Sequence, residues 1–332
     1  MKETAIDLGQ GGIFQLPGDT VPVPGWLLEV PPDSNAMRVD AFVCARVPRL
    51  SRSRASRLRL YDHETGRTLK KSSLVTPGQR ILAIRPTPDE DAHINDEPRI
   101  VWENDLWCLL NKPPMMATHP SASYFKRTVT YWLRCQGRQH MQSVHRLDVE
   151  TSGLLLFGKT TDAVRLGSDA FAAQAVRKDY LAVLDVRVPT GKERWCVDTP
   201  LGFDAESRVP IKMGVGTLSA ATHFKVLKRG SRRTLVQASP MGGRQHQIRV
   251  HAQLCGMPLV GDKLYGPDER FFLNRRKPLL DADLESLGHW RHALHAYRLS
   301  ASFLPEVFET AMPEDWNEIR GIHDYFLDGS GN

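Results

Sequence analysis

Residues 145–160 read HRLDVETSGLLLFGKT and form the part of the chain whose residue types and spacing most clearly permit chemistry. Two interpretations of this stretch compete. Residues 153–160 match the pattern G-x-x-x-x-G-K-[ST], in which backbone N–H groups and a lysine hold a nucleotide phosphate. Asp148 is, alternatively, a single carboxylate placed just before a buried strand. The two interpretations place the active site on different residues, so only one of them can hold.

The residues between Gly153 and Gly158 argue against the phosphate loop. They are three leucines and a phenylalanine, LLLF. A loop wrapped around a hydrated triphosphate would expose these side chains, and burying each of them is worth about 1.5–3 kcal/mol. A buried strand removes all four from water. We therefore interpret 153–159 as a strand that ends near Lys159.

Asp148 then acts alone, as a nucleophile or as a base. Glu150 could pair with it as in a glycosidase, but that chemistry needs two carboxylates flanking one bond, and nothing in the sequence places Glu150 on the opposite side. A lone aspartate beside apolar segments becomes protonated unless a cation or hydrogen bonds keep it ionised. Asp148 therefore needs a partner.

A second stretch, GGRQHQIRVHAQLCGMPLVGDKLYG at 242–266, can supply that partner. Its spacing predicts a helix over 245–255 with Gln245, Arg249 and Gln253 on one stripe, and with Ile248, Ala252 and Cys255 on a packing face. Arg249 is the best-placed cation for Asp148. The histidines at 246 and 251 are five residues apart, a poor spacing for ligands of one metal ion on a helix or a strand.

Composition limits the class of protein. The chain has 332 residues, 41% of them hydrophobic, which is enough for two domains with sizeable cores. Its five cysteines are odd in number and widely spaced, which fits a reducing cytoplasm, and we expect no disulfides, signal peptide or membrane span. The net charge of +6 favours an acidic partner such as nucleic acid.

The chain divides into four segments by its sequence pattern. Residues 1–33 are rich in glycine and proline and read as an irregular arm, 35–84 as a first domain, the acidic and proline-rich stretch 85–98 as a linker, and 99–325 as a second domain.

In the first domain we expect a helix that begins near Val39 and ends at Pro48, a second helix capped by Ser51, and a strand at 80–84. The two helices carry an arginine-rich patch that we expect to face phosphates. Its members are Arg38, Arg46, Arg49, Arg52, Arg54, Arg57 and Arg59, against a single acid, Asp40.

The second domain is predicted to be α+β with a largely antiparallel, mixed sheet, because strands outnumber helices and rarely alternate with them. Strands are expected at 100–102, 106–110, 153–159, 180–188, 221–227 and 234–238. Helices are expected at 129–135 and after a cap at Thr161 or Asp162, with Val164, Gly167, Phe171 and Ala175 on one face. The segment 267–288 has no motif that we can interpret.

Five motifs, in order along the second domain, resemble those of the RluA-like family of pseudouridine synthases. They are LNKPPMMATHP at 110–120, HRLDVETSGLLLFGKT at 145–160, KDYLAVL at 178–184, GRQHQIRVHAQLCGMPLVGDKLYG at 243–266 and LHAYRL at 294–299. The basic segment 35–84 is similar to the small α/β, S-four-like RNA-binding domain found ahead of the catalytic domain in many members. The resemblance therefore predicts an isomerase that acts on RNA.

The resemblance also implies roles for individual residues. Asp148 matches the catalytic aspartate, Tyr180 the tyrosine that stacks on the flipped uracil, and Arg249 the arginine that pairs with the aspartate. The other matches imply substrate-binding roles. Arg146 would displace the target base, Leu259 and Val260 would form the apolar floor beneath it, and Arg244 would also contact the RNA. In the basic segment, the residues expected to bind RNA are Arg52, Arg54 and Arg57.

Isomerising uridine breaks the bond from ring nitrogen to sugar and rejoins the base through carbon. The family's chemistry therefore requires no cofactor and no metal. We expect a cytoplasmic monomer whose partner is RNA: large-subunit ribosomal RNA is favoured, and transfer RNA is the alternative. An RNA-binding or ribosome-assembly factor without catalysis is the remaining alternative, and the presence of Asp148, Tyr180 and Arg249 argues against it.

Overall fold

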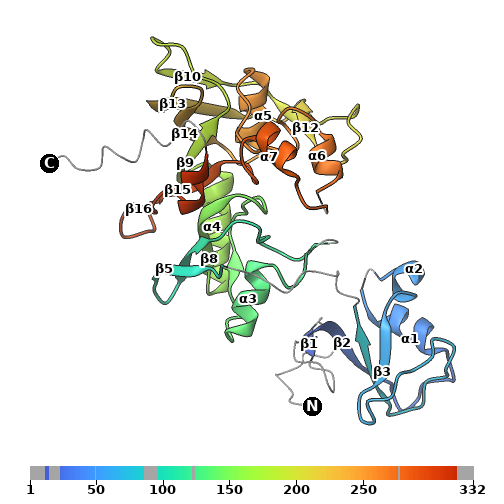
Figure 1. Ribbon diagram of the computed structural model, residues 1–332. Helices are drawn as coiled ribbons and strands as arrows, with labels where there is room; N and C mark the ends of the chain where they lie inside the picture. Colours follow the sequence, from blue (N-terminus) through green and yellow to red (C-terminus); the bar gives the residue numbers. More distant parts are fainter. Residues whose placement is uncertain are drawn as a thin grey trace. The chain divides into compact units, whose positions relative to one another are not determined.

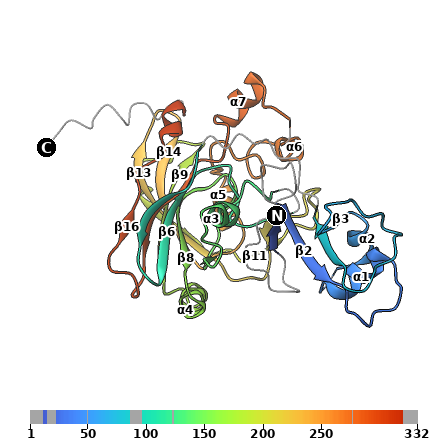
Figure 2. The ribbon, with the colours of Figure 1, turned by 90° about the horizontal axis from the view of Figure 1, so that it is seen from below.

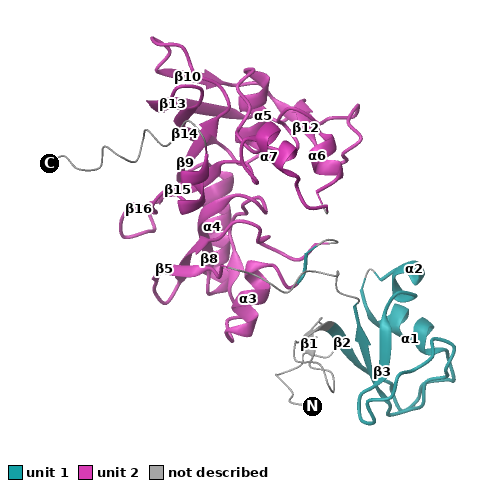
Figure 3. Ribbon diagram, in the orientation of Figure 1, with its two compact units in different colours: residues 1–90, 122–125 teal, residues 91–121, 126–332 magenta. Residues whose placement is uncertain are grey.

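The computed structural model describes residues 12–14, 23–48, 50–85, 96–121, 124–275 and 277–319. The chain divides into two compact units, one of residues 1–90 with 122–125 and one of residues 91–121 with 126–332 (Figure 3). The division falls inside the stretch 85–98, where we expected a linker; most of that stretch lies outside the described residues.

The first unit contains a four-stranded antiparallel sheet in the order β1-β2-β4-β3. Its strands are β1 (Gly12–Phe14), β2 (Val23–Glu29), β3 (Arg59–Asp62) and β4 (Arg80–Ile84), and its helices are α1 (Val39–Arg46) and α2 (Arg52–Ala55). Val39, Phe42 and Val43 of α1 are buried against Trp26, Leu28 and Ile81 of the sheet. The predicted helices, the cap at Ser51 and the strand at 80–84 are confirmed.

Strand β2 corrects the prediction that residues 1–33 are an irregular arm. Trp26 and Leu28 face the helices, whereas Leu27 packs with Leu82 and Ile84 on the other face, so a short apolar run is buried on both sides. Only glycine fits at position 25 of this strand, because a Cβ there would lie too close, 2.6 Å, to the carbonyl oxygen of Ala83. The prolines and glycines around this run hid the strand in the sequence pattern.

The second unit is built on a ten-stranded sheet whose main path is β10-β13-β14-β9-β15-β8-β6-β5 (Figures 1 and 2). All neighbours on this path are antiparallel except β15 and β8, which are parallel. The path consists of β5 (Arg99–Glu103), β6 (Trp107–Lys112), β8 (Ser152–Gly158), β9 (Arg177–Leu184), β10 (Arg194–Val197), β13 (Ala221–Arg229), β14 (Thr234–Met241) and β15 (Leu294–Ser300). This sheet confirms the α+β prediction.

Short elements complete the unit. Strand β7 (Gln142–Ser143) pairs with β8, β16 (Phe308–Glu309) pairs with β15, and β11 (Leu201–Phe203) pairs with β12 (Met213–Val215). The helices are α3 (Val129–Cys135), α4 (Thr161–Ala172), α5 (Gln247–Leu254), α6 (Arg270–Leu273) and α7 (Asp281–Leu287), followed by a 3-10 turn, η1 (Glu314–Glu318). Helices α6 and α7 occupy the segment 267–288 that the sequence pattern did not explain.

Both faces of the sheet are covered around the strands that carry the motifs. Strand β8 is buried along its whole length, as the LLLF run predicts, with α4 packed on one face and α3 on the other. Helix α5 covers one face of β9, β13 and β14, whereas Trp316 and Ile319 cover part of the opposite face. No helix within the described ranges is both long and apolar enough to cross a lipid bilayer.

Two predicted helix starts are wrong by one or two residues. The cap of α4 is Thr160, whose side chain accepts a hydrogen bond from the N–H of Ala163, and Ala175 lies beyond the end of that helix. Helix α5 begins only at Gln247, because His246 has a left-handed backbone with φ of 56°. Gln245 therefore lies before the helix and is not part of a helical stripe with Arg249.

Candidate active site

The loop that carries Asp148 leads directly into β8 and is held from three sides. The Thr118 side chain bridges the backbone N–H and C=O of Leu147. The ammonium of Lys112, fully buried at the end of β6, donates to the carbonyl oxygens of Pro113, Met116 and Val149 at 2.8–3.2 Å. A residue of the LNKPP motif thus ties the Val149 carbonyl of the Asp148 loop to the segment that follows β6.

The start of β8 leaves no room for a side chain on Gly153. This glycine has a φ of +113°, and a Cβ would lie 2.2 Å from the carbonyl oxygen of Ala296 on β15. The close approach fixes the position at which the loop leaves the sheet. His292, just before β15, bonds to the hydroxyl of Thr151 at 2.8 Å and holds the same loop from the other side.

The carboxylate of Asp148 accepts a hydrogen bond from Nη1 of Arg249 at 2.9 Å. The forked contact of Arg249 goes elsewhere: its Nε and Nη2 donate to the two carboxylate oxygens of Asp262 at 2.7 and 2.8 Å. Asp262 is fully buried and also accepts from the backbone N–H groups of Leu264 and Tyr265. Asp262 therefore fixes the guanidinium plane, and the remaining nitrogen reaches Asp148.

This arrangement keeps Asp148 ionised. Burial would raise the pKa of Asp148, whose side chain is 21% exposed, but the charge and the hydrogen bond of Arg249 lower it, as does positive charge on His246 or His292 when these rings are protonated, and the net pKa lies well below the usual range. Burial lowers the pKa of His246 itself to about 4, so this histidine is neutral at pH 7. Arg249 is then the neighbouring cation that holds the charge on Asp148.

A second hydrogen-bonded chain lies beside the carboxylate. The hydroxyl of Tyr265 accepts from the N–H of Met213 and lies 2.8 Å from Nδ1 of His246. If the hydroxyl donates its own proton to Nδ1, the Nε2 atom carries the hydrogen of the neutral ring. Nε2 lies 4.0 Å from Asp148, and this tautomer turns an N–H toward the carboxylate.

A cavity of about 520 Å³ opens in front of Asp148. Tyr180 of β9 lines it, half-buried, and burial together with the charge of Asp148 raises the pKa of its hydroxyl, which stays protonated. Apolar side chains on the wall include Phe171, Ile248 and Leu294. The cavity therefore combines one ionised carboxylate, one aromatic ring and an apolar wall.

The structure brings together five of the residues singled out in the sequence. Asp148, Tyr180, Arg249, Arg146 and Arg244 all line this cavity, and the two arginines at 146 and 244 are exposed. The Nε of Arg244 donates to the carbonyl oxygen of Ser219, which directs the side chain along the rim.

Leu259 and Val260 do not line the cavity. Leu259 is buried in the core that α5 forms with the sheet, and Val260 is buried with Val183 and Trp316 against the opposite face. The apolar floor made by these two residues therefore stays a prediction, and this cavity does not support it. Ile248 and Leu294 are the aliphatic side chains that line the wall near Asp148.

Several residues that hold the site were missed from the sequence. Glu150 accepts from Lys263 at 2.6 Å and from the N–H of His292 at 3.0 Å, so its charge is offset and it does not serve as a second acid at the cavity. Asp262 and Lys263 lie in the GDKLYG end of a motif already noted, and Lys112 lies in LNKPP. Their presence in these motifs was the available signal, but their partners are distant in sequence.

The arginines of the first unit that were expected to bind phosphate are exposed. Arg38 pairs with Asp40 at 2.7 Å, which offsets its charge. Within the described ranges, no acidic side chain pairs with Arg52, Arg54 or Arg57. Arg49 lies outside the described residues.

Comparison with known proteins defines the class to which this fold and site belong. Residues 107–254 match the sequence family described as RNA pseudouridylate synthase. The ribosomal large subunit pseudouridine synthase D of Neisseria meningitidis is 34% identical over 314 residues, which cover 87% of this chain and 79% of that protein. The chain belongs to the RNA pseudouridine synthase family and, as its motifs predicted, to the RluA-like group.

Two further comparisons agree with this assignment. The ribosomal large subunit pseudouridine synthase C of Haemophilus ducreyi is 33% identical over 233 residues, 66% of this chain and 68% of that protein. The solved structure of human RNA pseudouridylate synthase domain containing 1 shares the fold, with a TM-score of 0.54, 23% identity and coverage of 68% of this chain and 87% of that one. The protein is an enzyme that isomerises uridine to pseudouridine in RNA.

Proposed function

We propose that the protein modifies uridines of large-subunit ribosomal RNA and that Asp148 is its catalytic carboxylate. The observation that carries this proposal is the ionised Asp148 at the wall of a cavity, held by a guanidinium that Asp262 fixes from behind. This chain matches most of the length of two relatives that are named for the large ribosomal subunit, which supports the choice of RNA.

The reaction needs a charged oxygen and room for a base to turn. The bond between N1 of uracil and C1′ of the ribose breaks, the base rotates, C5 bonds to C1′, the proton on C5 is lost to a base, and N1 gains a proton. A carboxylate can attack C1′, attack the base, or remove a proton from the sugar, and each of these routes requires it to be ionised. Arg249 supplies that condition for Asp148.

The target uridine has to leave the RNA helix before it can reach Asp148. Extrusion of a base costs a few kcal/mol, and stacking on an aromatic ring offsets part of it. Tyr180 presents its ring to the cavity, and its protonated hydroxyl lies in the same space. Arg146 lines the cavity and is exposed, which supports a role in entering the helix as the base leaves it.

Variants of Tyr180 separate stacking from proton transfer. Tyr180→Phe keeps the ring, whereas Tyr180→Leu removes it, so a stacking role predicts that Leu weakens substrate capture by about 1–3 kcal/mol more than Phe does. A role of the hydroxyl in proton transfer predicts that Phe binds RNA normally but turns over slowly. Single-turnover rates and RNA affinities of both variants measure the two effects. Full activity of Tyr180→Leu would show that Tyr180 has neither of these roles.

The arginines of the first unit are expected to supply affinity for RNA. Replacing Arg52, Arg54 and Arg57 by alanine should reduce the slope of log affinity against log salt by up to about two to three, at roughly 0.7–0.9 per lost phosphate contact. Turnover at saturating RNA should be unchanged. Arg165→Ala on α4 is the control, because it removes an arginine outside this patch whose side chain is 77% exposed. Equal salt slopes for the triple variant and the parent would show that this patch does not contact RNA.

The choice of RNA is tested by mapping pseudouridine across total RNA from cells with and without the gene. We expect sites to disappear from large-subunit ribosomal RNA. Loss of sites from transfer RNA alone would replace the proposed substrate. An unchanged map would favour a role as a binding or assembly factor.

A further inference from the structure

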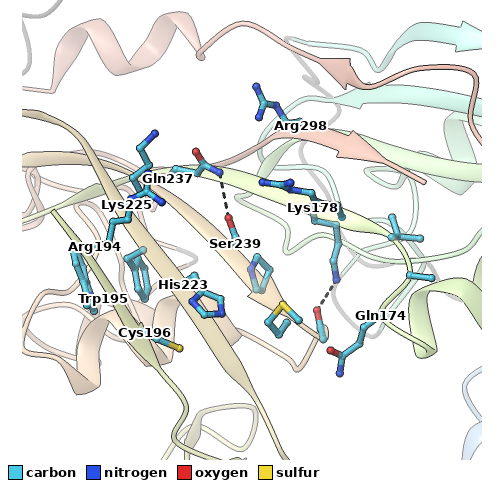
Figure 4. A pocket seen from close by; sticks show the side chains of 17 residues that line it. Gln174, Lys178, Arg194, Trp195, Cys196, His223, Lys225, Gln237, Ser239 and Arg298 are labelled. Carbon is cyan, nitrogen blue, oxygen red and sulfur yellow. Dashed lines mark hydrogen bonds between the residues drawn. The ribbon is translucent and has the colours of Figure 1, made fainter. Parts of the chain in front are cut away.

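A second groove, of about 790 Å³, lies on the sheet of the second unit (Figure 4). It crosses β9, β14, β13 and β10 on the face opposite to α5. The alternation along β13 shows which face this is: Phe224 and Val226 are buried under α5, whereas His223 and Lys225 are exposed in the groove.

The floor of the groove carries two facing positive charges whose repulsion destabilises the sheet. Arg194 of β10 and Lys225 of β13 are direct register partners, and both are exposed. Like charges directly opposite each other on neighbouring strands destabilise a sheet. No acidic side chain in the described part of the chain pairs with either of them. An anion bound between them would remove the repulsion.

The other end of the groove has its charges partly offset. Arg298 pairs with Glu309, and Arg177 lies 3.5 Å from the buried carboxylate of Asp179. Asp179 is fully buried beneath the groove and accepts a hydrogen bond from Ser239. The unpaired positive charge is therefore concentrated at Arg194 and Lys225, at the end away from Lys178 and Gln174 (Figure 4).

The groove adjoins the cavity of Asp148. Gln174, Lys178, Pro240 and Gly242 line both spaces. At this junction the Lys178 ammonium donates to the carbonyl oxygen of Gly242 at 2.5 Å and lies over the ring of Phe171. The groove therefore begins next to the cavity, at the contact between Lys178 and Gly242.

We propose that this groove binds the phosphate backbone of the RNA strand that flanks the target uridine, with Arg194 and Lys225 holding phosphates. The proposal rests on the proposed function, because it extends the path of the same substrate beyond the cavity. Phosphate contacts fix the position of a strand without reading its sequence, so the groove sets the register of the RNA and the cavity selects the base.

The first test removes the charge pair. Arg194→Gln together with Lys225→Gln should weaken binding of a large-subunit ribosomal RNA transcript by about 10- to 50-fold at 0.1 M salt and reduce the salt slope by about 1.4–1.8. Because the repulsion between the strands is relieved, the melting temperature without RNA should rise by about 1–3 °C at low salt. Arg165→Gln on α4, with 77% of its side chain exposed, is the control. Parent-like RNA binding by the double variant would overturn the proposal.

The second test needs no change of charge. Cys196 is exposed in the groove, and Cys135 is exposed at the end of α3. The same transcript should slow alkylation of Cys196 by iodoacetamide at least fivefold and leave the rate at Cys135 unchanged. Equal reactivity of Cys196 with and without bound RNA would show that RNA does not cover the groove and would overturn the proposal.

The two proposals fail in different ways. RNA bound to the Asp148→Asn variant should still protect Cys196 from alkylation, because phosphate contacts do not depend on catalysis. If Cys196 stays reactive although Asp148→Asn is inactive, the groove assignment is wrong and the proposed function stands. If RNA protects Cys196 and Asp148→Asn is active, the groove assignment stands and the catalytic role of Asp148 is wrong.

Discussion

Asp148→Asn is expected to abolish pseudouridine formation while the protein still folds and binds RNA. An amide is neither a nucleophile nor a base of useful strength, and loss of one positioned group of this kind lowers a rate by about a thousandfold or more. The structure explains why the fold should survive. Arg249 keeps its two hydrogen bonds to Asp262, so its charge remains paired when the carboxylate is replaced.

The measurement is the rate of pseudouridine formation in a single turnover, with RNA affinity and melting temperature measured beside it. Asp162→Asn is the matched control, because it makes the same chemical change on α4 at a side chain that is 93% exposed. A residual rate above about a thousandth of the parent value would contradict the catalytic role of Asp148.

Arg249→Lys should reduce both the rate and the stability. An ammonium cannot reproduce the planar contact that joins Asp148 to both oxygens of Asp262, and the buried Asp262 would be left with fewer donors. Breaking a buried ion pair costs about 3–5 kcal/mol of the free energy of unfolding. The weaker hold on Asp148 also raises its pKa, so the acid limb of the pH–rate profile should move to higher pH.

Asp262→Asn separates these effects, because it retains the charge of Arg249 beside Asp148. It should destabilise the protein but shift the acid limb less than Arg249→Lys does. Urea unfolding and pH–rate profiles of the two variants make the comparison. An acid limb that does not move in Arg249→Lys would show that another group keeps Asp148 ionised.

The sequence predicts the elements that are regular and amphipathic. Strand 80–84 and helix 129–135 have the predicted bounds; the strand is a short apolar run that follows a turn, and the helix begins at a capping threonine. Strand β2 was missed because prolines and glycines interrupt the pattern around it. Helix α5 begins later than predicted because His246 takes a left-handed backbone, which a periodicity of side chains does not reveal.

The site was only partly predictable for a related reason. Asp148, Tyr180 and Arg249 could be named from motifs, but consecutive motif residues do not share one environment. Leu259 and Val260 follow each other and pack on opposite faces of the sheet, because the backbone N–H of Val260 bonds to the carbonyl of Val183. Such contacts depend on the tertiary fold.

The position of β15 makes the site depend on a late part of the chain. This strand lies between β9 and β8, in the middle of the sheet, although it is formed by residues 294–300. The strands on one side of it carry the loop of Asp148, and those on the other side carry Tyr180 and support Arg249. A chain that ends before β15 therefore contains all three groups but lacks the strand that joins the two halves of the sheet. We expect such a truncated chain to be inactive.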